Sequence, residues 1–134
     1  MTQSARQGSG ATGGRRAFPS RPASVSGARH WVAARLSDAG PDVRETVVLL
    51  VSELAANAVQ HGGTPFTVRF DRTSERVRVE VTDDGGGQPH MGDRDESAVS
   101  GWGLRLVDAL ATAWGIGPAP KPATTVWFTV RPEP

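Results

Sequence analysis

The hydrophobic pattern of the chain changes its period near the middle, and this change constrains the fold more than any other feature. Over residues 43–61, apolar side chains recur every three or four positions, as they do on one buried stripe of a helix. From Phe66 onward they alternate with polar residues in two runs, 66–70 and 77–81, which a short polar turn separates. The sequence therefore predicts a long helix followed by a hairpin of half-buried strands.

Weaker patterns add elements on both sides of this centre. A first helix is predicted over 24–36, and a third over 104 to about 114. A strand is expected to start within 114–117, and residues 124–131 alternate like a last strand, whereas 83–103 are expected to form a glycine-rich loop. Helices and strands do not alternate regularly, so we predict an α/β (α+β) two-layer sandwich. Its sheet is mixed and mostly antiparallel, with the helices on one face.

The first 22 residues differ in composition from the rest of the chain. They are rich in Gly, Ser and Arg and nearly lack large apolar side chains. Such a segment cannot bury enough surface to offset the entropy lost on ordering. We therefore predict a disordered basic tail over residues 1–22 and a single domain over residues 23–134.

Composition and charge exclude several classes of protein. The chain has no cysteine, which rules out a disulfide scaffold and thiolate zinc sites. Four of the 15 basic residues lie in the tail, whereas all 14 acidic residues lie beyond it, so the domain has no basic surplus to hold nucleic acid directly. No apolar run approaches the ~20 residues of a membrane span, and the N-terminus carries no apolar secretion signal. We expect a cytoplasmic protein without a membrane partner.

The first of three notable motifs lies on the long predicted helix. Glu53 and Asn57 are four residues apart, and His61 follows after four more, so these side chains are predicted to share one face. A carboxylate and an amide oxygen are hard ligands that suit magnesium, and a carboxylate can also activate a hydroxyl group. The same residues would equally fit ordinary exposed positions on the polar face of a helix.

The other two motifs are glycine-rich and adjoin a strand and a helix. Asp83 follows the second predicted strand and precedes glycines 85–87. A carboxylate there can accept a hydrogen bond from the amine of a base, and glycine lets the backbone approach a ligand closely. Residues 101–104 (GWGL) precede the third helix, whose free N–H groups attract phosphate. A polar turn and a flexible loop are the alternative interpretations.

Taken in this order, the three motifs resemble the GHKL (Bergerat-fold) superfamily of ATP-binding domains, which includes gyrase, Hsp90, histidine kinases and MutL. The short length, the string Glu53–His61 (ELAANAVQH) and the C-terminal Thr125–Trp127 are most similar to one branch. That branch is the anti-sigma-factor serine/threonine kinases, which have a histidine-kinase-like ATPase domain. The resemblance covers roughly residues 22–132.

The resemblance implies ATP and Mg²⁺ as cofactors and a role for each matching residue. Glu53 would be the general base, and Asn57 would be the magnesium ligand. Asp83 would accept a hydrogen bond from the amino group of adenine. Thr125 would support the adenine through water, although the adjacent Thr124 is a second threonine at this place. Gly85 and Gly87 would shape the adenine pocket. Gly101 and Gly103 would form the hinge of the ATP lid, and Leu104 would belong to the helix that follows it.

The resemblance also implies a regulatory function. Such proteins bind a sigma factor and phosphorylate a serine of a small antagonist protein, and they commonly pair as dimers. The segment 88–100 would be a short lid without a lysine to clamp the γ-phosphate, which leaves open a non-catalytic module that binds ATP and only sequesters a partner. A third alternative, a structural domain without nucleotide, requires all three motifs to be coincidental. A P-loop and the signatures of eukaryotic-type kinases are absent from the sequence.

Overall fold

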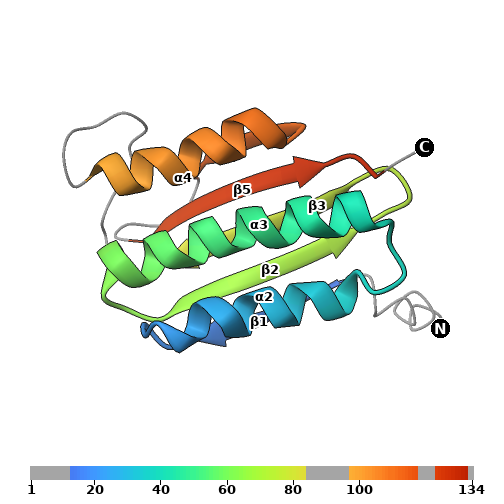
Figure 1. Ribbon diagram of the computed structural model, residues 1–134. Helices are drawn as coiled ribbons and strands as arrows, with labels where there is room; N and C mark the ends of the chain where they lie inside the picture. Colours follow the sequence, from blue (N-terminus) through green and yellow to red (C-terminus); the bar gives the residue numbers. More distant parts are fainter. Residues whose placement is uncertain (1–12, 84–96, 118–122, 133–134) are drawn as a thin grey trace.

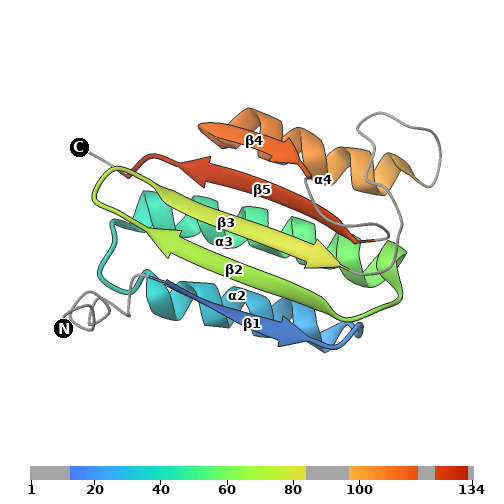
Figure 2. The same ribbon diagram turned by 180° about the vertical axis from the view of Figure 1, so that it is seen from behind.

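The computed structural model describes residues 13–83, 97–117 and 123–132, which form two layers (Figures 1 and 2). The sheet has five strands in the order β1-β2-β3-β5-β4, and every neighbouring pair is antiparallel. The helices cover one of its faces, which confirms the predicted two-layer α+β sandwich. The strands are β1 (Gly13–Phe18), β2 (Phe66–Arg72), β3 (Val77–Asp83), β4 (Ala113–Ile116) and β5 (Thr124–Val130). The helical elements are α2 (Ala23–Arg35), α3 (Pro41–Asn57), the π-helical turn η2 (Ala58–Gly62) and α4 (Ser97–Leu110).

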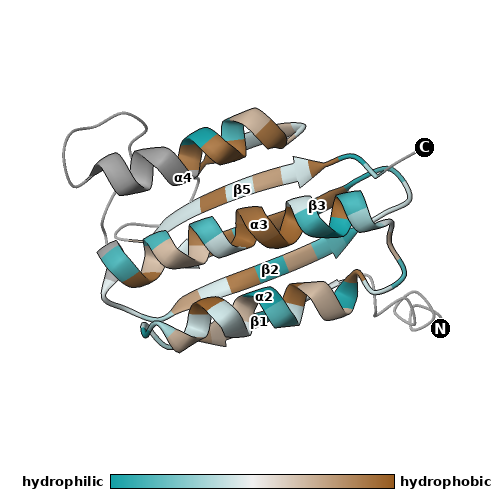
Figure 3. Ribbon diagram, in the orientation of Figure 1, coloured by the Kyte–Doolittle hydropathy of each residue, from teal (hydrophilic) through white to brown (hydrophobic). Residues whose placement is uncertain are grey.

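The long predicted helix is α3, and it lies at the centre of the helical layer. Pro41 and Asp42 occupy its first turn. Proline suits this position because its missing N–H would have no intrahelical partner, and the Asp42 carboxylate suits the positive end of the helix dipole. Its predicted stripe is buried against the sheet, and Figure 3 shows hydrophobic residues on its central turns. None of the described helices is long and apolar enough to cross a membrane.

Strand β1 corrects the prediction of a disordered tail for part of its length. Residues 13–18 pair with residues 66–71 of β2, from Gly13 opposite Asp71 to Phe18 opposite Phe66. The Phe18 and Phe66 rings stack with centroids 5.4 Å apart, and Phe18 is the only buried residue of β1. An edge strand gains its order from hydrogen bonds to its neighbour, so composition alone did not reveal it. Residues 1–12 of the predicted tail lie outside the described residues.

Helix α4 begins and ends earlier than the sequence predicted. It starts at Ser97 and includes Gly101 and Gly103, which were expected in the loop before it. Glycine inside a helix costs about 1 kcal/mol, which is why the sequence places the boundary after the pair. Packing of α4 against α3 outweighs this preference, since helices in proteins derive most of their stability from tertiary contacts. Trp114 belongs to β4, the strand expected near this position.

Two arginines from other elements hold the C-terminal end of α2. Arg44 donates to the carbonyl of Leu36 at 3.3 Å, and Arg72 of β2 donates to the carbonyl of Arg35 at 3.2 Å. Arg72 also pairs with Asp38 at 2.7 Å. These bonds satisfy carbonyls that the end of a helix leaves without intrahelical partners.

The Arg72 guanidinium, through its hydrogen bond and its charge, holds the pKa of Asp38 below its ordinary value of 3.8. Because the folded-state pKa is depressed, the pair stabilises the fold above the ordinary pKa and loses this effect as the pH falls through the folded-state value. We predict that Asp38→Asn slightly lowers the free energy of unfolding at pH 7 and has no effect near pH 2. Urea titrations of both proteins at each pH measure this, and 1 M salt should shrink the difference at pH 7. An undiminished difference at pH 2 would contradict the assignment.

Gly115 of β4 gives a test of packing at the sheet edge. A Cβ atom here would lie 2.8 Å from the Trp127 indole, so the ring must shift. We predict that Gly115→Ala lowers the free energy of unfolding by about 1–3 kcal/mol. Gly13→Ala in the opposite edge strand is the matched control, because its added Cβ meets neighbours only at 3.4 Å and beyond. Urea denaturation should show a clear loss for the first variant alone, and equal effects would refute the close packing of Trp127.

Candidate functional site

One end of the molecule brings together predicted site residues that are far apart in the sequence. Figures 1 and 2 show the C-terminal end of α3 and the start of α4 at the same end as the end of β3 and the beginning of β5. Asp83 is the last residue of β3, and it pairs with Thr124, the first residue of β5. We refer to this region as the Asp83 end. The turn η2, which continues α3, contacts β3 here.

The side chain of Asp83 lies on the face of the sheet that the helices cover. Residues two apart in a strand share a face, and Val79 and Val81 before it are buried in the core. Asp83 itself is half-buried. Its cross-strand neighbour Thr124 is 8% exposed and shares the core face with Val126. The structure therefore places a carboxylate and a hydroxyl side by side at the boundary between the two layers.

The same alternation places Thr125 on the opposite face. Its hydroxyl forms a hydrogen bond of 2.7 Å with Thr82, directly across the strand pair. The structure therefore places Thr124, and not the predicted Thr125, on the same face of the sheet as Asp83. The signal that identifies Thr124 is its parity with Val126 and the other buried even-numbered residues of β5.

Glu53 and Asn57 lie in the last two turns of α3, one turn apart and both half-buried. The side-chain nitrogen of Asn57 is buried and has no hydrogen-bond partner among the described residues. A ligand with a hydrogen-bond acceptor would satisfy this nitrogen, while a metal ion would bind the amide oxygen. Within the described part of the chain, no three His, Cys, Asp or Glu residues gather to hold a metal ion. A magnesium ion here would need oxygens of its nucleotide as further ligands.

The turn η2 changes the helical phase beyond Asn57. A π-helix closes its hydrogen bonds over five residues rather than four, which breaks the repeat that predicted one face for Glu53, Asn57 and His61. The turn stops where Gly63 adopts the left-handed region with φ 67°, as expected for glycine after a helix. Single π-turns often occur at functional sites, and this one adjoins Asn57.

The structure describes only the second of the two glycine motifs. Gly85 and Gly87 lie outside the described residues. Gly101 and Gly103 belong to the second turn of α4, so the helix starts before them rather than after them. Leu104 is fully buried in the core and anchors α4.

Comparison with known proteins identifies the family. A family model described as the histidine kinase-like ATPase domain matches residues 18–130. The chain belongs to this family, which confirms the GHKL resemblance of its motifs. A chain in the crystal structure of the SiaB–SiaC complex from Pseudomonas aeruginosa has the same fold. It superposes with a TM-score of 0.61 at 14% identity, over 98% of each chain. No curated protein matches the sequence.

Proposed function

We propose that this protein binds Mg-ATP at the Asp83 end and acts as a regulatory serine/threonine protein kinase of the anti-sigma-factor type. One observation carries the proposal. This chain belongs to the histidine kinase-like ATPase family, and its Asp83 and Thr124 lie side by side on the inner face of the sheet. Both adjoin the end of the helix that bears Glu53 and Asn57.

The residues of the sheet would bind the base. A carboxylate at this boundary accepts a hydrogen bond from an exocyclic amine, and the hydroxyl of Thr124 supports a ring nitrogen directly or through water. Gly85 and Gly87 are proposed to shape the same pocket. These interactions would hold adenine between the sheet and the helical layer.

The residues of the helices would serve the phosphates and the acceptor. Asn57 is the proposed magnesium ligand, and bound magnesium supplies the charge neutralisation that phosphoryl transfer needs. Glu53, when ionised, would accept the proton of a serine hydroxyl or of water. Gly101 and Gly103 lack Cβ atoms in the second turn of α4, which would let its backbone approach a phosphate, while Leu104 fixes the helix in the core.

The proposed partner is a protein. A sigma factor, or a small antagonist protein with a serine acceptor, fits the anti-sigma type, and the structural neighbour also comes from a complex of two proteins. A homodimer and a cytoplasmic location belong to the same proposal. The second candidate is a module that binds ATP and sequesters its partner without phosphotransfer, which the absence of lysine from residues 88–100 favours.

Two variants separate ATP binding from phosphotransfer. We expect calorimetry to show ATP binding that depends on magnesium and is lost in EDTA. Asp83→Asn should weaken this binding about tenfold or more, because it removes a charged hydrogen-bond acceptor. Glu53→Ala should leave binding nearly unchanged and reduce phosphotransfer to a co-encoded antagonist by about 10²–10⁴. Equal loss of binding in both variants would refute this division, and binding without transfer in the natural protein would favour sequestration.

The second prediction tests which threonine faces the nucleotide. Thr124→Val removes a hydroxyl beside Asp83, and we expect it to weaken ATP binding by about 2–10-fold. Thr125→Val is the matched control, since it removes only the hydrogen bond to Thr82 on the other face. It should lower stability but leave the dissociation constant for ATP unchanged. The opposite pattern in calorimetry would return the assignment to Thr125.

A further inference from the structure

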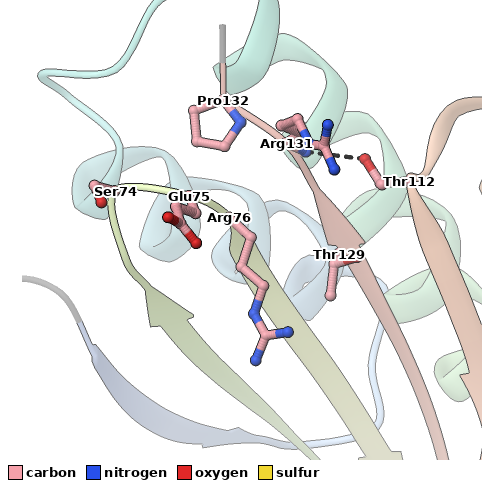
Figure 4. Close-up of a pocket in the computed structure, with 7 residues that line it drawn as sticks. All are labelled: Ser74, Glu75, Arg76, Thr112, Thr129, Arg131 and Pro132. Atoms are coloured by element: carbon pink, nitrogen blue, oxygen red, sulfur yellow. Dashed lines mark hydrogen bonds between the residues drawn. The ribbon is translucent and has the colours of Figure 1, made fainter. Parts of the chain in front are cut away.

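The face of the sheet that the helices leave open contains a hollow at the end opposite to the Asp83 end. Figure 4 shows its walls, which come from the turn between β2 and β3, from the segment between α4 and β4, and from the end of β5. Its volume is about 670 Å³, within the usual range for small-molecule sites. The proposed nucleotide site does not use any residue of this hollow.

Two arginines line this hollow, one just before β3 and the other just after β5. The pairing of β3 with β5 ends at Val77 opposite Val130, and Arg76 and Arg131 are the next residues beyond this pair. Because Val77 and Val130 point into the core, both arginines lie on the open face. In Figure 4, Arg76 extends along the sheet beside Thr129, and Arg131 lies next to Thr112. Like charges that lie close together on one face of a sheet are destabilising unless opposite charges provide compensation.

The described part of the chain does not supply that compensation. Neither Arg76 nor Arg131 forms an ion pair with a described carboxylate. The neighbouring Arg78 differs, since it pairs with Glu80 at 3.0 Å and covers the Trp127 ring at 4.4 Å. Glu75 lines the hollow but pairs with neither arginine. Among the described residues, the two guanidinium groups therefore have no ion-pair partner, although the Glu75 carboxylate lies in the same lining.

Hydroxyl groups add further donors around the two arginines. Ser74 and Thr112 are exposed in the wall, and Thr129 forms part of the floor. The Thr112 oxygen already accepts the backbone N–H of Arg131 at 3.0 Å, which fixes Thr112 beside the Arg131 side chain and leaves its hydroxyl proton to donate. Two guanidinium forks with hydroxyl donors offer more hydrogen bonds than a planar carboxylate accepts. They match the three oxygens of a phosphate monoester.

We propose that this hollow is a binding site for a phosphate monoester, held by Arg76 and Arg131 with Thr112 beside them. The site is distinct from the nucleotide site, since the two lie at opposite ends and on opposite faces of the sheet. The phosphate can come from a phosphorylated serine of a partner or from a small phosphorylated compound. Both sources present the same three oxygens.

Amide NMR titration of the ¹⁵N-labelled protein tests the proposal. The probes are sodium phosphate, a phosphoseryl peptide and the same peptide without phosphate, each compared with sodium chloride at equal ionic strength. We expect phosphate and the phosphopeptide to shift the amides of Arg76, Thr112 and Arg131. The plain peptide should not shift them. Tighter binding of the phosphopeptide than of free phosphate identifies a protein partner, and the reverse order identifies a small compound.

Matched variants make the result specific. Arg76→Gln and Arg131→Gln should each weaken binding at these amides about tenfold or more, since each removes a charged donor. Arg69→Gln removes the same charge from an exposed residue of the same face, where Arg69 pairs with Asp71 at 3.7 Å, and should leave binding unchanged. Circular dichroism confirms that all three variants fold. Shifts confined to the Asp83 end, or equal weakening in all three variants, would overturn the proposal.

Discussion

The packing of α3 against the sheet is the contact on which the rest of the structure depends. Its buried stripe, which includes Val47, Leu50 and Leu54, meets the inner residues of the strands in one continuous core. The same helix contacts α2, α4, β3 and β5. Burial of this stripe fixes the rotation of α3 and also its position along the sheet. The polar residues at its C-terminal end therefore have a defined place relative to the end of β3.

That place brings the residues of two weak motifs together at the proposed nucleotide site. The helix contributes a carboxylate and an amide at Glu53 and Asn57, and the sheet contributes Asp83 and Thr124 from two paired strands. All four residues lie on regular elements rather than on loops, which suits a site whose groups must hold their geometry. The π-helical turn after Asn57 ends the helix at this boundary, so α3 does not continue past the edge of the sheet.

The open face of the sheet carries charged residues, whereas the covered face is packed with apolar residues. Its charged residues partly neutralise one another along single strands, as Arg78 does with Glu80 and Arg69 with Asp71. Arg76 lies just before β3 and Arg131 just after β5, and neither residue takes part in these ion pairs. The covered face thus contains the proposed nucleotide site at one end. The open face carries, at the other end, two arginines that form no ion pair with a described carboxylate.

Much of the fold was predictable because periodicity is a local property of the sequence. The stripe of α3, the hairpin of β2 and β3 and the helical position of Glu53 and Asn57 all follow from spacing alone. Strand β1 was not predictable, because its order comes from pairing with β2 rather than from its own composition. The start of α4 was misplaced for a similar reason, since packing on α3 outweighs the local cost of two glycines.

The sequence by itself determined the family chemistry: which residue types occur, in which order, and on which kind of element. It did not determine which residue of the last strand lies beside Asp83, because that depends on the register of two strands that are distant in the sequence. Only the register of β3 with β5 decided for Thr124. The same register placed Arg76 and Arg131 at one end of the sheet, although 55 positions separate them in the sequence. Such pairings are set by the burial of whole strands against α3, which no local pattern encodes.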